Sequence, residues 1–460
     1  MYGAVIAFGI ASLMLCLGMI LCKKVPYLHK SLIPASVIGG VTGLVLVNYV
    51  LVHINGIDTG ILAFNDIVDI FFCFSFISIG LTQNSDKDPG KPKEKNDIPS
   101  KKKGIAGGII GMSLIWCILY AITPVAAAGI IALSGKPFNI EPVYGLLIPF
   151  AFCQGPGQAM TYGRLFENVY GFENAEMVAL TFAVIGYFVA FIIGIPIAKY
   201  GLEKGLAKVK SNNKNKHITD NNKKEPDSKI KSYNMGIDKI VLHISLMGVC
   251  YLIANGLSRL LLFIPGIGSS FSAMNFFWGL IVACIVRKIM EKFNISHMLD
   301  SNLQTGITGC LTDYLVCCSF MAVQINIIKK WLIPILITSI ICTIITIIIC
   351  LYFSARLGSD HDFERFLGLY GTCTGTVPCG MSLIKIADPN LKTGTDMELG
   401  IMNIGMSMTT PVVLLIMMTG LQKIPLFTTC IIILVVTLIY IILLKVFRAW
   451  GKPTFYLIRR

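Results

Sequence analysis

Long apolar runs separated by short polar segments constrain the fold of this chain more than any other feature. A helix of about twenty apolar residues crosses the ~30 Å hydrocarbon core of a bilayer. About eleven runs are long enough to span a membrane, or nearly so. They cover residues 5–22, 33–52, 66–83, 104–133, 178–198, 240–264, 271–286, 305–323, 331–353, 399–419 and 426–446. With 55% hydrophobic and 14% charged residues, the chain is too apolar for a soluble domain, and we predict an all-α integral membrane protein.

Two further apolar stretches are too short to span and are interrupted by glycine and proline. One reads Phe-Ala-Phe-Cys-Gln-Gly-Pro-Gly-Gln at residues 150–158, and the other reads Gly-Thr-Cys-Thr-Gly-Thr-Val-Pro-Cys-Gly at residues 371–380. Irregular backbone at membrane depth is tolerated only where it is buried in protein or lines a cavity. We therefore predict a re-entrant hairpin near residues 143–170 and another near residues 364–390. The alternative is a pair of helix kinks packed against neighbouring helices.

Basic residues in the loops predict the orientation in the membrane. Loops after odd-numbered spans are rich in lysine, whereas residues 53–65 contain neither Lys nor Arg. Because basic loops stay in the cytoplasm, the N-terminus is predicted outside and the C-terminus inside. The first hairpin then enters from outside and the second from the cytoplasm. The net charge of +14 is thus a topology signal and does not indicate nucleic-acid binding.

The predicted organisation is two inverted repeats of five transmembrane helices, each with a re-entrant hairpin. Residues 1–200 form the first repeat, residues 201–238 a basic cytoplasmic linker, and residues 239–460 the second repeat with one extra C-terminal helix. Inverted repeats with broken helices near the midplane are typical of secondary transporters. A channel would need a continuous polar stripe along its spans, and a membrane enzyme would need a nucleophile with a base. The sequence offers neither pattern.

The turns of the two hairpins are the predicted substrate site. A helix that begins at mid-membrane presents unpaired N–H groups and the positive end of its dipole, which favour an anion. Glycine lets the backbone approach a ligand, and proline sits where an N–H is dispensable. The predicted substrate-binding residues are Gln154, Gly155, Gly157, Gln158, Gly375, Thr376 and Pro378.

Oxygen ligands near the same turns predict a site for Na⁺, the expected coupling ion. The candidates are Thr181, Thr374, Thr376, Asn403, Ser407 and Asp313. Asp313 is either an ion-coupling group or a hydrogen-bonded structural acid, since a carboxylate in a span should face the interior or an aqueous path. Fifteen cysteines lie in apolar runs without metal-ligand spacing, so no transition metal, disulfide or other cofactor is expected.

Three segments resemble the bacterial sodium/glutamate symporter family. They are Ile-Pro-Ala-Ser-Val-Ile-Gly-Gly at 33–40, Phe-Ile-Ser-Ile-Gly-Leu at 76–81, and Gly-Arg-Leu-Phe-Glu-Asn-Val-Tyr-Gly-Phe-Glu-Asn-Ala-Glu at 163–176. The order of spans, the basic central loop and the hairpin positions also agree. Residues 154–158 depart from the Gly-Gly-His-Gly-Thr that the family carries in its first hairpin.

The resemblance implies a multi-pass protein of the bacterial cell membrane that imports glutamate, or a similar small carboxylate, by symport with Na⁺. It also implies a homodimer in which a transport domain moves against a scaffold. Two alternatives stay open. One is a symporter of di- or tricarboxylates of the 2-hydroxycarboxylate type, and the other, from a different class, is an ion channel.

Overall fold

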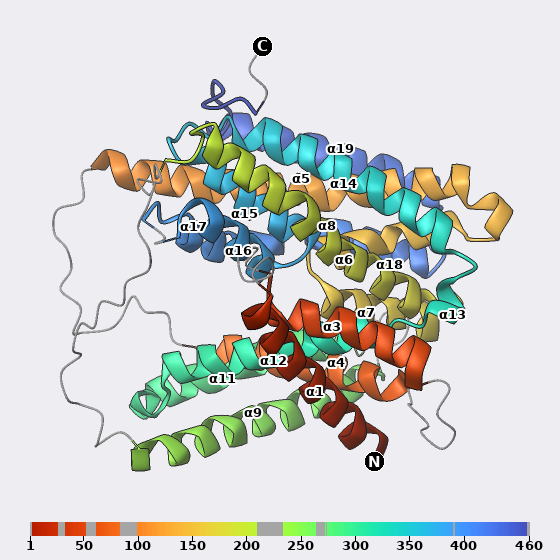
Figure 1. Ribbon diagram of the computed structural model, residues 1–460, viewed down its shortest axis with the longest axis vertical. Coiled ribbons are helices and arrows are strands. Elements are labelled where there is room, and N and C mark those ends of the chain that lie inside the picture. The colour runs from red at the N-terminus through yellow and green to blue at the C-terminus, as the bar shows by residue number, and fades with distance from the viewer. Residues whose placement is uncertain are drawn as a thin grey trace. The chain divides into compact units, whose positions relative to one another are not determined.

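The computed structural model describes residues 2–25, 33–51, 61–82, 99–208, 233–263, 272, 274–389 and 392–457. All secondary structure within these residues is helical, which confirms the predicted all-α class (Figure 1). Residues 209–232, most of the predicted linker, lie outside the described residues. The same holds for residues 52–60 and 83–98, which contributed to the predicted orientation.

Nine helices in the described part of the chain are long and apolar enough to cross a membrane. The protein is therefore a multi-pass membrane protein. Two of the predicted spans form helices that fall short of this criterion. The run at 33–52 is divided between α3 (Ala35–Val45) and η1 (Leu46–Val50), a π-helical turn. The run at 271–286 becomes α11 (Asn275–Lys292), which carries four charged residues in its C-terminal third.

The chain divides into two compact units. The first comprises Met1–Asn65, Glu94–Lys210 and Val316–Arg460, and the second comprises Asp66–Lys93 and Ser211–Leu315. Each unit thus combines segments from both sequence halves, and α4 (Ile61–Leu81) and α12 (Ser301–Ala322) run across the division. The repeat boundaries at 1–200 and 239–460 describe the sequence, not these units, and stay a prediction.

The first unit contains the greater part of the helices. In addition to α3 and η1, its elements are α1 (Tyr2–Lys24), α5 (Pro99–Ser134), η4 (Lys136–Phe138), η5 (Pro142–Leu147), α6 (Ile148–Phe152), α7 (Pro156–Arg164), η6 (Leu165–Val169), α8 (Ala175–Glu203), α13 (Ile325–Ile328), α14 (Leu332–Ser354), α15 (Asp362–Thr374), α16 (Val377–Ala387), α17 (Thr395–Met402), η8 (Asn403–Thr409), α18 (Thr410–Gly420) and α19 (Leu426–Val446).

Close helix contacts in the first unit depend on glycine. Helices α1 and α3 touch at Gly18 and Gly39, where a Cβ on Gly39 would lie 2.9 Å from the carbonyl carbon of Met14. Small residues allow such approach between membrane helices, for which apolar surface alone gives no driving force. Gly39 belongs to the segment 33–40 that resembles the symporter family, so this part of the motif serves helix packing.

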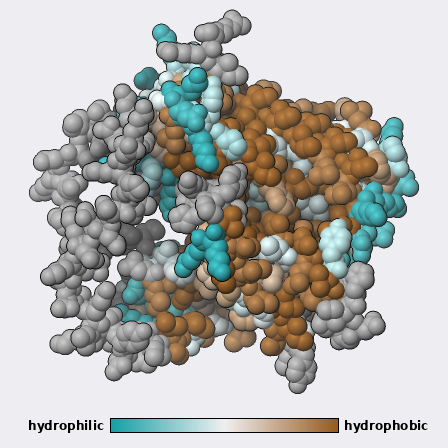
Figure 2. Space-filling model, viewed as in Figure 1, coloured by the Kyte–Doolittle hydropathy of each residue, from teal (hydrophilic) through white to brown (hydrophobic). Residues whose placement is uncertain are grey.

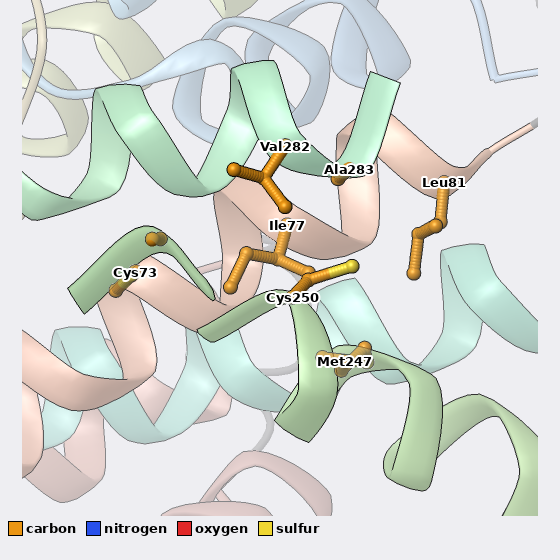
Figure 3. Close-up of a cluster of buried hydrophobic side chains, with 8 residues drawn as sticks. Cys73, Ile77, Leu81, Met247, Cys250, Val282 and Ala283 are labelled. Carbon is orange, nitrogen blue, oxygen red and sulfur yellow. The ribbon is translucent and has the colours of Figure 1, made fainter. Parts of the chain in front are cut away.

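The second unit has its own apolar core, shown in Figure 3. It contains α9 (Tyr233–Leu261), α11 and η7 (Ser296–Met298), together with most of α4 and α12. Ile77 of α4, Cys250 of α9 and Val282 of α11 meet at its centre. Gly80 completes the contact between α4 and α11, because a Cβ there would lie 2.7 Å from that of Ala283.

Apolar side chains also gather on the outer surface. Figure 2 shows them over the region where Figure 1 places α14. Ile333, Ile340 and Ile348 are each about half exposed on this helix. Such a face suits the lipid environment of a spanning helix, where apolar exposure carries no penalty.

Candidate functional site

The first predicted hairpin corresponds to two short helices, α6 and α7, which we call the first pair. Phe150 of α6 stacks on Tyr162 of α7 with ring centroids 3.6 Å apart, so the two helices lie against each other. The turn between them ends at Gly155, whose φ of 83° is a conformation that L side chains rarely adopt. Pro156 then opens α7 at the position where a missing N–H costs nothing.

The second predicted hairpin corresponds to α15 and α16, the second pair. These helices pack closely, because a Cβ on Gly371 of α15 would lie 2.7 Å from the Cα of Gly380 in α16. The turn contains Gly375 and Thr376, and Thr376 is the N-cap of α16 in an extended conformation. The Thr376 carbonyl accepts hydrogen bonds from the N–H groups of Cys379 and Gly380 at 2.9 and 3.1 Å.

The turns of the two pairs meet. A Cβ on Gly155 would overlap Cγ2 of Thr376 and lie 3.4 Å from the carbonyl oxygen of Gly375. Two residues before each of these glycines, the thiol of Cys153 donates to the carbonyl oxygen of Cys373 at 3.8 Å. The N-cap residues of α7 and α16 therefore touch, and the positive ends of two helix dipoles converge at one point inside the first unit.

Two tyrosines hold polar atoms of the turns. The hydroxyls of Tyr187 in α8 and Thr376 are hydrogen-bonded at 3.2 Å, and the Tyr120 hydroxyl of α5 donates to Oε1 of Gln154 at 3.4 Å. Gly186 lets α8 pass close behind the second turn, because a Cβ there would overlap the carbonyl oxygen of Thr374. Thus α5 and α8 supply the walls against which both turns rest.

Gln158 stands in the first turn of α7 and is 6% exposed. Its Oε1 atom is buried and finds no hydrogen-bond partner among the described residues. A buried amide oxygen left unpaired costs about 1–3 kcal/mol, so this atom is an acceptor that a ligand or a water molecule can use. The neighbouring Gly157 is buried too, and its carbonyl accepts from the Thr161 hydroxyl at 3.0 Å.

Not all predicted ligands gather at the turns. Pro378 is at the start of α16 and exposed, and Thr374 uses its hydroxyl on the Tyr370 carbonyl at 2.7 Å. Thr181, on α8, likewise donates to its own helix, to the Met177 carbonyl at 2.7 Å. Asp313, in contrast, is exposed and belongs to the second unit, whereas the turns belong to the first.

The remaining two cation candidates lie on η8, a 3₁₀-helical break in the span that follows the second pair. The side chain of Asn403 is outside the described part of the structure. Ser407 is exposed, and its carbonyl accepts from the Thr410 hydroxyl at 2.7 Å. Ser407 also lines an apolar pocket of about 400 Å³ with residues of α5. No contact among the described residues brings Asn403 or Ser407 to the turns.

The N-terminal end of α15, which we call the base of the second pair, carries a buried ion-pair network. Arg365 of α15 donates two hydrogen bonds of 2.7 Å to the carboxylate of Glu398 in α17. Both side chains are at most 1% exposed. It also donates to Asp362 at 2.9 Å. Near the same base but exposed, Asp360 pairs with Lys208, whose hydrogen bond lowers the pKa of the carboxyl group to about 2.

Several of these residues were not predicted from the sequence. Tyr187, Tyr120 and Gly186 lie inside apolar spans and carry no local pattern that marks them. Arg365 and Glu398 offered a signal, because ionisable residues in apolar segments are expected to be paired. Glu398 stands in the first turn of α17, where a carboxylate complements the helix dipole, yet its role in the ion pair depends on a contact that only the fold reveals.

Comparison with known proteins gives consistent matches. Residues 2–386 match the family described as sodium/glutamate symporter. The chain is 30% identical to a sodium/glutamate symporter of Escherichia coli strain K12 over 193 residues, 41% of this chain and 42% of that protein. It is 23% identical to a sodium/glutamate symporter of Haemophilus influenzae over 330 residues, 70% of this chain and 72% of that protein. The match thus spans less than half of the E. coli relative.

Proposed function

Because the chain belongs to the sodium/glutamate symporter family, we propose that it imports glutamate together with Na⁺. The observation that carries this proposal is the contact between Gly155 and Thr376, the N-caps of two helices in separate broken pairs. Convergent helix N-termini favour negative charge, and glutamate brings two carboxylates. This architecture is typical of secondary transporters and is not needed by a channel.

The substrate carboxylates would bind at the starts of α7 and α16. In α7, the backbone N–H groups of Gly157 and Gln158 have no carbonyl acceptor within the helix, because the first N–H groups of any α-helix lack one. Gly155 and Gly375 supply backbone without side chains at the point of closest approach. Tyr187 and Tyr120 would keep Thr376 and Gln154 in place while the ligand enters and leaves.

Gln158 would distinguish an amino acid from a plain dicarboxylate. Its unpaired Oε1 is an acceptor, which suits the α-ammonium group of glutamate and cannot bind a carboxylate. Hydrogen bonds to a charged group contribute about 1.5–3 kcal/mol, enough to set the preference. This feature favours glutamate over a di- or tricarboxylate as the substrate.

Na⁺ would bind at oxygen atoms of the second turn. The Thr374 and Gly375 carbonyls and the Thr376 hydroxyl lie within one short irregular segment, and unwound carbonyls are the usual Na⁺ ligands of such transporters. Thr181, Asn403 and Ser407 stay candidates for a second cation, and Asp313, which belongs to the other unit, stays a separate candidate. Glutamate carries a net charge of −1, so more than one Na⁺ must accompany it if the membrane potential is to favour import.

The arrangement in the membrane is part of the same proposal. The two pairs are re-entrant hairpins of two inverted repeats, with the first entering from outside and the second from the cytoplasm. The N-terminus is outside, the C-terminus is inside, and the protein is a homodimer in the bacterial cell membrane. The basic loops support the orientation, and the family resemblance supports the dimer.

Calorimetric titration of the purified protein with glutamate, in NaCl and in choline chloride, tests the coupling. If both ligands bind at the turns, Na⁺ should tighten glutamate binding, and glutamate should tighten Na⁺ binding by the same factor. Coupling free energies of this kind correspond to about 5- to 150-fold in affinity. Equal glutamate affinity in the two salts would rule out a coupled site.

A further inference from the structure

The chain continues beyond α19 into a C-terminal segment, residues 447–457, that returns to the second pair. The N–H of Gly451 donates to the Arg356 carbonyl at 2.7 Å, and the N–H of Thr454 donates to the Ala355 carbonyl at 2.7 Å. The segment is thereby fastened by backbone hydrogen bonds to the turn between α14 and α15. Both partners belong to the first unit.

Side chains extend this attachment to α15 itself. The Thr454 hydroxyl shares its one proton between Oδ2 of Asp362, the first residue of α15, at 2.9 Å and the Ala355 carbonyl oxygen at 3.0 Å. The ring of Phe455 packs on Phe363 and Phe366 with centroid distances of 5.5 and 6.4 Å. All three rings are buried, so the segment covers the start of α15 on both its polar and its apolar side.

Asp362 connects the segment to the ion-pair network. Its Oδ2 also accepts from the N–H groups of Gly358 and Ser359, while its Oδ1 accepts from Arg365. Arg365 in turn holds Glu398 of α17 through two hydrogen bonds. Thr454, itself exposed, is thus the outer end of a chain of polar contacts that is buried at Asp362, Arg365 and Glu398. This chain holds the N-terminal end of α15.

We propose that residues 447–457 are a positioning segment for the second pair, with Thr454 and Phe455 as its positioning residues. Helix α15 is a single rigid element of 13 residues, with Asp362 at one end and Thr374 at the other. Holding its N-terminal end therefore also holds the position at which Thr376 meets Gly155. The segment lies beyond residue 386, where the family match ends, and its effect on transport rests on the proposed function.

Two matched variants test the positioning role without relying on transport. Thr454→Val keeps the shape of the side chain and removes the hydroxyl, whereas Thr454→Ser keeps the hydroxyl. Hydrogen–deuterium exchange of the purified full-length protein in nanodiscs should show faster exchange of residues 362–374 in Thr454→Val. Residues 156–164 should be unchanged, and Thr454→Ser should match the wild type. Unchanged exchange of residues 362–374 in Thr454→Val and in Phe455→Leu would overturn the proposal.

Uptake measurements then connect the positioning to the site. Residues along a contact network shift coupling by amounts equivalent to about 2- to 30-fold in affinity. Thr454→Val should therefore raise the Na⁺ concentration for half-maximal glutamate uptake by such a factor at a similar maximal rate, and Thr454→Ser should restore it. Faster exchange without any change in half-saturating Na⁺ would refute the positioning role. If the wild type moves no glutamate at all, the proposed function fails and the exchange data still decide whether the segment holds α15.

Discussion

At the scale of single residues, Gly155 is held by two independent constraints. Its φ of 83° with ψ near −173° is a region that essentially only glycine occupies, and Thr376 leaves no room for a Cβ. The conformational penalty alone is about 1–3 kcal/mol for another residue. The overlap with Thr376 comes in addition and acts directly at the contact between the two turns.

We therefore predict that Gly155→Ala abolishes glutamate uptake. Gly171→Ala is the matched control, because Gly171 has a similar φ of 81° but nothing within 4 Å of its added Cβ. It should cost some stability and retain uptake. Uptake assays on membranes with equal protein levels measure both effects. Similar uptake by the two variants would show that contact between the turns is irrelevant to transport.

The same overlap predicts a partial rescue. Thr376→Ser removes the Cγ2 methyl group that the new Cβ would meet and keeps the hydroxyl that pairs with Tyr187. Gly155→Ala combined with Thr376→Ser should therefore recover part of the uptake that Gly155→Ala loses. The double-mutant cycle requires Thr376→Ser alone as its reference. Strictly additive losses would contradict a direct contact between residues 155 and 376.

Gln158 provides a prediction about specificity. Gln158→Met keeps an unbranched side chain of similar length but has no strong acceptor for an ammonium group. It should weaken glutamate binding by about tenfold or more, the equivalent of one hydrogen bond to a charged group. Inhibition by glutarate, a dicarboxylate of equal length without the ammonium, should stay unchanged. Equal losses for both ligands would indicate that Gln158 does not bind the ammonium.

At this scale, the sequence predicted residues with a local signature and missed those defined by distant partners. Glycine and proline identify a turn because their backbone restrictions act within one residue, which is why Gly155 and Gly375 were expected. Tyr187 and Thr376 are 189 positions apart, so their hydrogen bond depends on the tertiary fold. The pairing of Arg365 with Glu398 is hidden for the same reason.

At the scale of elements, the interrupted stretches were found at the expected places. The predicted hairpins at 143–170 and 364–390 contain the turns at Gly155 and Gly375, and α15 begins two residues earlier than expected. Helices α3 and α11 are the elements for which hydropathy overestimated the span. Helix α3 gives way to the π-helical turn η1 after Val45, and the charges of α11 fall in its last turns.

The proposed re-entrant geometry of the two pairs yields a labelling prediction. Cysteines at positions 141 and 173, which flank the first pair, should both react only from outside. Cysteines at positions 360 and 392, which flank the second, should both react only from the cytoplasm. Glu141, Glu173, Asp360 and Lys392 are all exposed, so a Cys-depleted background with single replacements is suitable. Labelling of one pair from opposite sides would mean that the pair crosses the membrane.

At the scale of the whole molecule, the spanning helices were predictable and their grouping was not. A lipid-facing surface and a helix-facing surface are equally apolar, so hydropathy cannot tell which spans are neighbours. The two units accordingly combine segments from both halves of the sequence. The family could be inferred from motifs such as the segment 33–40, part of which serves helix packing through Gly39.

The central claim is that glutamate enters together with Na⁺, and uptake of radiolabelled L-glutamate into proteoliposomes tests it most directly. An inward Na⁺ gradient should drive accumulation above the external concentration, and an inside-negative potential should increase it, as the proposed coupling to more than one Na⁺ requires. Replacing Na⁺ by choline should abolish accumulation, and vesicles with the Gly155→Ala variant give the background. Uptake that is equal in choline, or that only equilibrates glutamate across the membrane, would contradict Na⁺-coupled symport.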